Sequence, residues 1–499
     1  MASKIFMGNM PELMEKILNN LNNELYSLYS CALVSRHWCK MSIPILWKDP
    51  FSFEQKTLFI SKYFSSLDEN EKLRLKESLR IYKINIEISE TLFDYARFLK
   101  VLDLSRLGWR VTKWIFPEFV NFFRLEHRIS LTTYIVNLLL KIFIESGANL
   151  HKLDLYFSDL LKIKPEIFCS LEQNEQFFSR LQDLSLSFIS EFNTENSIKL
   201  LRILAKNATK INALKLNEIY STYDQQPLNA LIESQEQLRK FSLVGGNFPI
   251  EFYDIISALE SQENSLQEVT IEKCVCSTVF KMLMNCKNLE ILRIRNCENV
   301  EILEAKLKTF EITSCTINAS NIVQILQKSG TLLQRLKLKS TGEESFLLEA
   351  IKSFCPNIIY LDLSYFKFSS QLLELIGNLK NLQFLTLWCM SYIPEELNMQ
   401  IIQFAKTLPL TLQYLDFADF WLKPYIDILL NHCNVPLKKL IINHLDNERN
   451  VKALIEFCIR HKTLNYVSLD RFLSLEDNIR KEIEAYVTLV PYEHIVVNC

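Results

Sequence analysis

The hexapeptide Leu382-Gln-Phe-Leu-Thr-Leu387 belongs to a pattern that recurs, with apolar substitutions, over most of the 499-residue chain. Large apolar residues occupy its first, fourth and sixth positions. Thirteen copies follow one another with a mean spacing of about 26 residues. They start at Leu150, Leu181, Ile211, Leu238, Leu266, Leu289, Leu307, Leu333, Ile358, Leu382, Leu412, Leu437 and Leu464. Because side chains alternate along a strand, the last two apolar residues of each copy point to one face.

The roughly 20 residues between successive copies leave room for a helix that returns the chain to the next strand. The stretches Ile322–Leu326 and Leu372–Ile376 have the apolar spacing of such helices. A period of about 20–29 residues is typical of leucine-rich repeats, whose units bury a continuous core by stacking. We therefore predict an α/β fold: a curved leucine-rich-repeat solenoid with parallel strands on the concave face and helices on the convex face.

The limits of the solenoid are less regular than its centre. Degenerate copies are expected at Leu99 and Ile81, and a final strand is expected from Glu493 to Val497. Residues 105–149 are predicted to be an irregular part of the array, with a helix from Leu131 to Ser146 leading into Leu150. We predict three parts: a domain over residues 1–50, a helical linker over 51–80 and the solenoid over 81–499.

Composition argues against several classes of enzyme and binding protein. The chain has only 8 glycines, and no pair of them opens a phosphate-binding loop. The net charge of -2 gives no electrostatic footprint for nucleic acid. The most apolar run, Tyr134–Ile144, is interrupted by Asn137 and Lys141 and is too short to span a bilayer. We expect no nucleic acid or membrane partner, and a cytoplasmic or nuclear location.

The 13 cysteines indicate reduced thiols rather than a disulfide framework. Cys274, Cys297 and Cys315 each lie eight residues after a repeat start, which is the Asn/Cys position of a leucine-rich repeat. A zinc site is the alternative, but Cys274-x-Cys276 has no second pair at zinc-finger spacing. Packing in the repeat ladder is therefore favoured. We expect no catalytic residue, no cofactor and no metal.

The first fifty residues do not follow the repeat. Pro11 suits the first position of a helix, and Glu12 beside it complements the helix dipole. Leu13, Ile17 and their neighbours then form an apolar stripe. Fifty residues cannot enclose so many large apolar side chains, which suggests a partner surface, although such a stripe is more often core.

This segment resembles an F-box, whose pattern is Leu-Pro, an acidic residue, Leu, Ile-Leu, a leucine-rich helix, Leu-Val-x-(Arg/Lys)-x-Trp and Leu-Trp. Met10 replaces the leading leucine, and the run Ser35–Cys39 with Pro44–Pro50 is similar to fungal members. The matching residues are Pro11, Glu12, Leu13, Ile17, Leu18, Leu21, Leu28, Cys31, Leu33, Val34, Arg36, Trp38, Leu46 and Trp47. An F-box followed by leucine-rich repeats resembles the F-box/leucine-rich-repeat family.

The resemblance implies a substrate-recognition subunit of a Skp–cullin–F-box ubiquitin ligase, with no catalysis of its own. The F-box would bind a Skp-type adaptor and, through it, a cullin-RING ligase. The implied adaptor-binding residues are Pro11, Leu13, Ile17, Leu18, Leu21, Leu33, Val34, Trp38 and Trp47. The alternative is a repeat scaffold or sensor without a role in ubiquitination, whose N-terminal helices cap the solenoid.

Positions that alternate with the buried leucines point to the concave face, where an unknown protein substrate would bind. Five of them are basic: Arg293, Arg295, Arg335, Lys337 and Lys339. Five are aromatic: Tyr360, Phe384, Trp388, Tyr414 and Tyr466. Aromatic residues and arginine are enriched in binding hot spots, and a basic strip suits an acidic or phosphorylated partner. Taken one at a time, each position is more typical of a solvated strand site, and only the aromatic run as a group favours a binding surface.

Overall fold

The computed structural model describes residues 11–21, 24–52, 57–82, 84–116, 125–157, 163–188, 195–219, 225–246, 251–276, 282–283, 285–300, 306–340, 342–390, 397–417, 424–442, 445, 448–469 and 477–499. The chain divides into two compact units, each considered separately below. Unit 1 comprises Met1–Gly246 with Ser257–Gln262, and unit 2 comprises Asn247–Ile256 with Glu263–Cys499.

Unit 1 begins with helices. Their bounds are α2 (Pro11–Asn19), α3 (Leu25–Ala32), α4 (Arg36–Leu46), η1 (Thr57–Ser66), α5 (Glu69–Arg80) and η2 (Ala96–Phe98). Two of the starts are set by capping side chains, which satisfy main-chain N–H groups that lack a helical partner. Ser35 accepts a hydrogen bond from Trp38 N before α4, and Asp68 accepts one from Glu71 N before α5.

Strands and helices then alternate in unit 1. The elements are β1 (Val101–Asp103), α6 (Leu104–Ile115), α7 (Leu125–Glu145), β2 (Lys152–Phe157), α8 (Pro165–Gln173), η3 (Glu175–Phe177), β3 (Asp183–Phe188), α9 (Glu195–Asn207), β4 (Ala213–Ile219), α10 (Gln226–Glu233) and β5 (Lys240–Gly245). Neighbouring strands pair in parallel and in chain order. After β5 come α11 (Tyr253–Leu259) and η4 (Glu260–Gln262).

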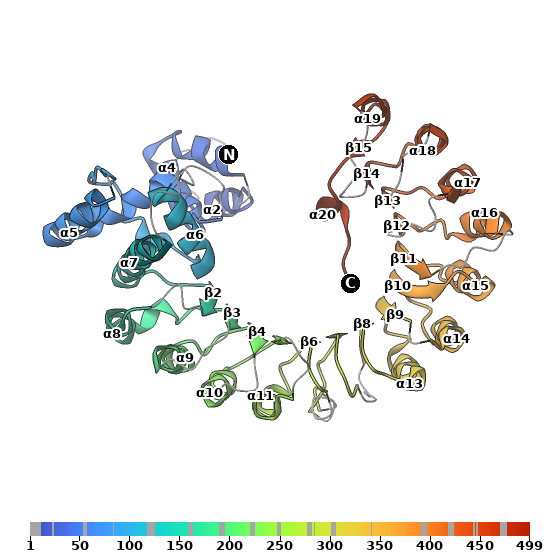
Figure 1. Ribbon diagram of the computed structural model, residues 1–499, viewed down its shortest axis with the longest axis horizontal. Coiled ribbons are helices and arrows are strands. Elements are labelled where there is room, and N and C mark those ends of the chain that lie inside the picture. Colours follow the sequence, from blue (N-terminus) through green and yellow to red (C-terminus); the bar gives the residue numbers. More distant parts are fainter. Residues whose placement is uncertain are drawn as a thin grey trace. The chain divides into compact units, whose positions relative to one another are not determined.

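Unit 2 begins with three strands that have no complete helix between them in the described residues, and strands and helices alternate after that. Its elements are β6 (Glu268–Glu272), β7 (Ile291–Arg295), β8 (Thr309–Thr313), α13 (Ala319–Ser329), β9 (Arg335–Lys339), α14 (Glu344–Phe354), β10 (Tyr360–Lys367), α15 (Ser370–Asn378), β11 (Phe384–Met390), α16 (Leu397–Thr407), β12 (Tyr414–Phe417), α17 (Ile426–His432), β13 (Lys439–Ile442), α18 (Glu448–Arg460), β14 (Tyr466–Leu469), α19 (Asp477–Glu484), β15 (Thr488–Leu489) and α20 (Tyr492–Ile495). The strands line the inner side of this unit, and the helices α13–α19 lie outside them (Figure 1).

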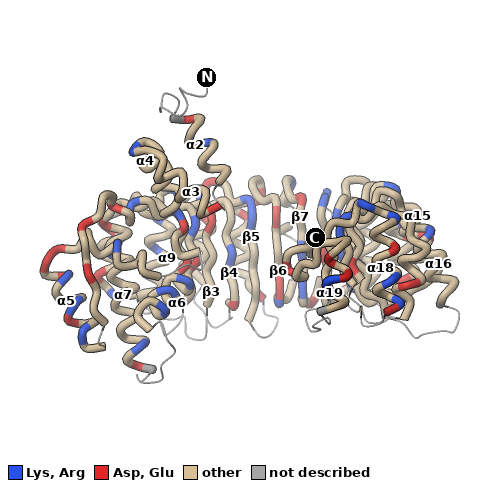
Figure 2. The backbone as a smooth tube through the Cα atoms, turned by 90° about the horizontal axis from the view of Figure 1, so that it is seen from above, with Lys and Arg blue, Asp and Glu red and all other residues tan. Residues whose placement is uncertain are grey.

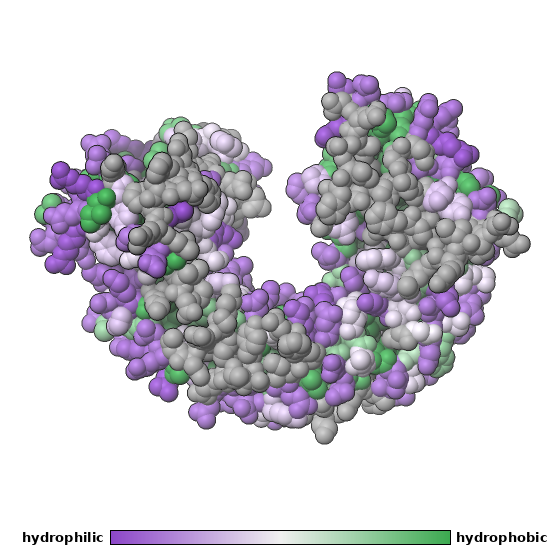
Figure 3. Space-filling model, viewed as in Figure 1, coloured by the Kyte–Doolittle hydropathy of each residue, from purple (hydrophilic) through white to green (hydrophobic). Residues whose placement is uncertain are grey.

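The register confirms the predicted repeat. Leu361 in β10 pairs with Leu336 in β9 and with Leu385 in β11, so equivalent leucines stack from repeat to repeat. All three are fully buried. The predicted leucine-rich-repeat solenoid is therefore confirmed, because parallel strands stack in chain order and bury equivalent leucines against one another. Hydrophilic residues dominate the outer rim of each unit in the view of Figure 3, with isolated hydrophobic ones between them.

Two of the outlying strand predictions are wrong. The degenerate copy expected at Ile81 is not a strand, since the described residues there form a turn and irregular backbone after α5. The strand expected from Glu493 to Val497 is replaced by α20 and four residues of irregular backbone. The copy at Leu99 is confirmed, because β1 pairs with β2.

The irregular region predicted at 105–149 contains two helices in its described part, α6 and α7. Helix α7 has 21 residues and is longer than the apolar run Tyr134–Ile144. By length and composition alone, Glu126–Glu145 could cross a membrane, but 61% of this window is buried within the protein. Such burial is what the core helix of a folded domain shows.

Candidate functional site

The helices α2, α3 and α4 form a small core of their own. Met14, Leu18, Leu28 and Trp38 are buried in it, and Leu21 packs partly buried against them. The apolar surface of three predicted adaptor-binding residues is therefore packed in this core. These residues are Leu18, Leu21 and Trp38. Helical periodicity identifies an apolar stripe, but it does not say which edge of the stripe faces inward.

Four of the predicted adaptor-binding residues outside this core are exposed apolar side chains, two on α2 and two between α3 and α4. Leu13 and Ile17 are 37% and 43% exposed, and Leu33 and Val34 are 71% and 63% exposed. We call these four residues the N-terminal apolar face. They include four of the nine predicted adaptor-binding residues. Pro11 is the first residue of α2, and its side chain lies outside the described part of the chain.

Two exposed aromatic residues on α3 escaped the sequence analysis. Tyr26 and Tyr29 are 81% and 60% exposed and lie three residues apart, on one side of the helix. The sequence does contain evidence for this pair, because two tyrosines at this spacing widen the apolar stripe. The F-box pattern specifies the leucines of this helix and does not specify these tyrosines.

Trp47, the last predicted adaptor-binding residue, packs within unit 1 instead. Its ring stacks on Tyr95 with centroids 4.0 Å apart and meets Tyr63 edge-on at 5.2 Å. The next residue continues the contact, because Lys48 O accepts hydrogen bonds from Lys100 N and Val101 N at 2.9 and 3.1 Å. Lys100 O receives the same pair of bonds from His151 and Lys152. The residues after α4 thus supply the first rung of the repeat ladder.

The predicted basic strip in unit 2 is largely paired. Arg295 makes a two-pronged contact with buried Glu311 at 2.7 Å for both hydrogen bonds. Arg293 contacts Glu268 at 2.5 Å and Glu311 at 3.7 Å. Figure 2 shows Lys and Arg interspersed with Asp and Glu over the whole chain. These arginines therefore carry much less free positive potential than their sequence suggested.

The two lysines of the strip also contact other side chains of this protein. Lys337 Nζ lies 3.0 Å from Asp362. Burial raises the pKa of Asp362, and the charge of Lys337 opposes that effect. Lys339 Nζ contacts Ser314 Oγ at 3.1 Å and lies over the ring of Tyr365 at 4.5 Å. An acidic partner would compete with these internal contacts.

The aromatic positions separate into two groups. Tyr360 and Tyr414 are each only 1% exposed, and Phe384 packs against Tyr414 with ring centroids 6.1 Å apart. Trp388 and Tyr466 are 42% and 43% exposed. Trp388 also stacks on Tyr365. The exposed pair is open to a partner, whereas the other three are covered by another part of this chain.

That covering part is the segment of residues 490–499, named here the C-terminal segment. Tyr360 Oη donates a hydrogen bond to Val497 O at 3.1 Å, and Arg293 donates two to Cys499 O at 3.2 and 3.0 Å. Arg335 donates to Asn498 O. Five predicted substrate-binding residues, Arg293, Arg335, Tyr360, Phe384 and Tyr414, contact this segment or the apolar cluster it joins.

The strand face also contains a buried carboxyl group. Asp416 Oδ2 accepts a hydrogen bond from Tyr414 Oη at 3.1 Å, while its Oδ1 has no hydrogen-bond partner. Burial raises the pKa of Asp416 to about 7, and the bond from Tyr414 partly opposes that rise. This group changes charge near neutral pH.

The repeat cysteines follow their predicted slots. Cys274, Cys297 and Cys315 each donate an S–H hydrogen bond to the carbonyl two residues earlier, at 3.2, 3.2 and 3.3 Å. In the described residues, no group of three or more His, Cys, Asp or Glu side chains is arranged to hold a metal ion. Burial raises the pKa of Cys286 to about 11, which keeps that thiol protonated at neutral pH.

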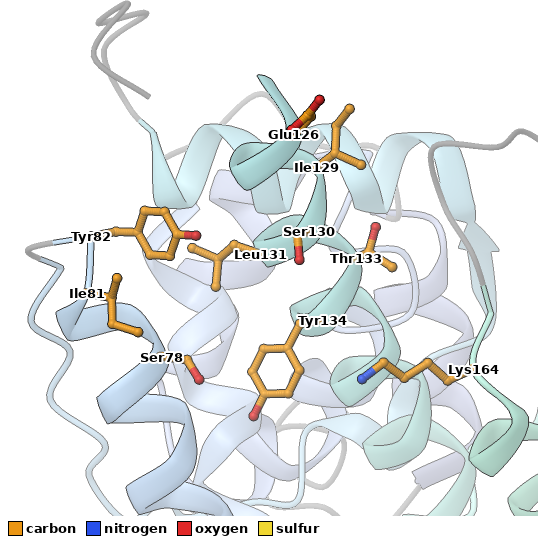
Figure 4. Close-up of a pocket in the computed structure, with 10 residues that line it drawn as sticks. All are labelled: Ser78, Ile81, Tyr82, Glu126, Ile129, Ser130, Leu131, Thr133, Tyr134 and Lys164. Atoms are coloured by element: carbon orange, nitrogen blue, oxygen red, sulfur yellow. The ribbon is translucent and has the colours of Figure 1, made fainter. Parts of the chain in front are cut away.

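A pocket of about 720 Å³ lies in unit 1 between α5, α7 and the residues before α8. Tyr82, Leu131 and Tyr134 line it, and Glu126 and Lys164 are its charged residues (Figure 4). Lys164 Nζ lies over the ring of Tyr134 at 5.4 Å. The pocket shares no residue with either predicted binding surface.

Comparison with known proteins agrees with the two-part organisation. Residues 11–52 match the family model described as F-box-like. The chain therefore combines an F-box-like domain with a leucine-rich-repeat solenoid. None of the curated proteins compared matches it.

Three solved structures are among those that align with the chain. The yeast Rad7–Elc1 complex contains a chain with 14% identity and a TM-score of 0.42, covering 87% of this chain and 95% of that one. A leucine-rich-repeat protein of Leptospira interrogans has 14% identity and a TM-score of 0.30, covering 70% and 86%. The leucine-rich-repeat protein LegL7 of Legionella pneumophila has 15% identity and a TM-score of 0.26, covering 71% and 89%.

Proposed function

We propose that this protein is the substrate-recognition subunit of a Skp–cullin–F-box type ubiquitin ligase. Its F-box-like domain binds a Skp-type adaptor, and the strand face of its repeats binds a protein substrate. The observation that carries the proposal is the N-terminal apolar face, which lies exposed on a domain that matches the F-box-like family model. A cytoplasmic or nuclear location is part of the same proposal.

The energetics of the apolar face favour a docking role. Leu13, Ile17 and Leu33 do not need their exposed surface to complete the core beneath them, because Met14, Leu18 and Leu28 already fill it. Burying a large aliphatic side chain fully against a partner is worth roughly 1.5–3 kcal/mol before ordering costs. Three or four such residues supply a plausible affinity for a stable adaptor complex.

The rival function is a scaffold whose N-terminal helices only cap the solenoid. In unit 1, other residues contact the first repeat and can cap it, namely Trp47 and Lys48. A cap alone would leave no reason for four large exposed apolar side chains in the same domain. The exposed face therefore favours docking over capping alone.

The proposed role is binding rather than chemistry. A receptor of this kind holds a substrate lysine near an enzyme loaded with ubiquitin, and such proximity raises the effective concentration of the two groups. Specificity then depends on the strand face, where Trp388 and Tyr466 are the exposed aromatic anchors.

Co-purification with a recombinant Skp-type adaptor tests this proposal. The full chain should retain the adaptor, whereas Leu33→Asp and Ile17→Asp should each weaken binding at least tenfold, because a carboxylate would be buried in an apolar interface. Leu73→Asp is the matched control, since Leu73 is 57% exposed on α5 outside the F-box-like domain. Deleting residues 1–50 is a poorer test because it also removes the Lys48 rung.

Failure of the intact chain to retain any adaptor would contradict the ligase role. Retention by the wild type and by both substituted chains would leave the role standing and refute the N-terminal apolar face as the docking site. Circular dichroism of each variant shows whether it is folded.

A further inference from the structure

The C-terminal segment lies on the strand face of unit 2 and runs back over repeats that precede it in the chain (Figure 1). It leaves β15, forms the single turn α20 and continues to Cys499. Val497 N donates to Tyr414 Oη in β12 at 3.4 Å, and the following carbonyls meet residues of β10, β9 and β7. The segment thus passes over strands in the reverse of their chain order.

Side chains hold the last three residues of this segment in place. Successive carbonyls of Val497, Asn498 and Cys499 accept hydrogen bonds from Tyr360, Arg335 and Arg293. None of these bonds belongs to the main-chain ladder of the parallel sheet. Side chains of the strand face therefore donate hydrogen bonds to the main chain of these residues, as they would to a separate peptide.

Upstream of these carbonyls, the segment is anchored by branched aliphatic residues. Ile495 is 1% exposed and forms a cluster with buried Tyr414 and Ile441. Val497 packs against the same cluster, as do Phe384, Tyr492 and Val490. Hydrogen bonds to carbonyls carry no sequence information, whereas a shaped apolar cluster selects the side chain that fills it.

We propose that the strand-face surface beneath the C-terminal segment is a peptide-binding site, and that this segment is its displaceable internal ligand. We call this surface, formed by Arg293, Arg335, Tyr360, Phe384 and Tyr414, the groove. The groove takes a segment of a partner protein with branched aliphatic residues at positions i and i+2, the first of them at the end of a helical turn, followed by main-chain oxygens facing Arg335 and Arg293. This inference rests on the proposed function, because it names the class of substrate segment that the strand face accepts.

Occupation of the groove makes partner binding competitive. An internal ligand at high effective concentration reduces the apparent affinity of an external peptide by the fraction of time that the groove is closed. The contacts are compatible with exchange, since they comprise a small apolar cluster and a few hydrogen bonds. A partner with the same chemistry and additional contacts to exposed Trp388 or Tyr466 would displace the segment.

A synthetic peptide of residues 490–499 serves as the probe, with the full chain under reducing conditions. Ile495→Asp places a charge in the apolar cluster and should release the segment from the groove. The Ile495→Asp chain should then bind the peptide at least tenfold more tightly than the wild type, as measured by fluorescence anisotropy. His494→Asp, at an exposed neighbouring position, is the matched control and should behave like the wild type.

The binding residues are tested in the same background. Adding Tyr360→Phe and Arg293→Ala to Ile495→Asp should reduce peptide binding at least tenfold, because both changes remove donors to the peptide carbonyls. Amide exchange in the wild type should show that Val497 and Asn498 open at least a hundredfold more often than the β12 strand. This difference separates a displaceable ligand from a permanent part of the fold.

Three results would overturn the inference. The first is equal, weak peptide binding by the wild type and by Ile495→Asp, with the variant folded. The second is exchange at Val497 only through global unfolding. The third is dimerisation of Ile495→Asp in sedimentation without peptide binding, which would make a second copy the occupant. Adaptor co-purification depends on the F-box-like domain, so its outcome is read separately from all three.

Discussion

Single residues on the strand face show how strongly context changes a side chain's meaning. Arg295 and Lys337 occupy strand positions where a free cation was expected, yet each lies beside a buried carboxylate. Asp416 differs from both, because its buried Oδ1 has no hydrogen-bond partner. The free-energy cost of burying this carboxyl group is therefore only partly offset. The residue type identifies the charge, and the side chains on neighbouring strands determine whether that charge is neutralised.

Asp416 predicts a measurable pH dependence of stability. Its pKa is about 7 in the folded protein, against an ordinary value near 3.8. The folded state therefore keeps its proton while the unfolded state loses it, so this group's contribution is complete below pH 4 and is lost as pH rises to 7. The loss amounts to about 4 kcal/mol at most.

Asp416→Asn removes this titration with little change in size. The variant should be more stable than the wild type at pH 8, and the difference should shrink as pH falls toward 4. Urea unfolding across this pH range measures it, with Asp183→Asn at an exposed carboxyl as the control. Parallel pH profiles for wild type and Asp416→Asn would contradict the assigned cause.

At the scale of elements, the distance between neighbouring helices determines whether a position has room for a side chain. Gly330 follows α13, and a Cβ at this position would overlap the main-chain carbonyls of Phe354 and Leu326. Gly377 lies within α15, where a Cβ would meet Thr407 Cβ at an ordinary 3.7 Å. The two glycines therefore have different reasons to be there.

This contrast predicts opposite effects of the same substitution. Gly330→Ala should lower the free energy of unfolding by about 1–3 kcal/mol, since α14 must shift to make room. Gly377→Ala should raise it by about 0.5–1 kcal/mol, because alanine restricts the unfolded chain and favours the helix. Chemical denaturation of both variants measures the pair, and destabilisation by Gly377→Ala would refute the space assigned to it.

At the scale of the whole molecule, a repeat array propagates stability mainly between neighbouring repeats. The F-box-like domain joins this array through Trp47, whose ring packs on Tyr95 and Tyr63. The residues that contact the first repeat, Trp47 and Lys48, thus differ from the exposed residues proposed to bind the adaptor. A perturbation at the Trp47 edge should stay within the nearest repeats.

Trp47→Ala is expected to destabilise the start of unit 1 by about 3 kcal/mol, through lost burial and ring contacts. Amide exchange should accelerate in β1 and β2 and stay unchanged in β12. Trp388→Ala is the matched control, because that tryptophan is 42% exposed and should cost only about 1 kcal/mol through its stacking on Tyr365. Equal acceleration in β1 and β12 would contradict nearest-neighbour coupling.

Periodicity by itself determined the repeat class and the strand positions of the thirteen copies, whereas the F-box resemblance rests on motif residues in the first fifty positions. These features are local, since a leucine ladder needs only a fixed spacing and a strand's alternation of faces. The register of Leu336, Leu361 and Leu385 across three strands follows directly from that spacing. Local patterns also placed the cysteines in their repeat positions.

Tertiary structure alone decided which predicted site residues are available. It turned Leu18 and Trp38 inward while leaving Leu13 and Leu33 exposed, because three helices share one core. It also brought Cys499 to Arg293 across 206 residues of sequence, covering half of the predicted substrate surface. No local pattern carries such a contact, because its partners meet only after the repeats have stacked and the chain has turned back over them.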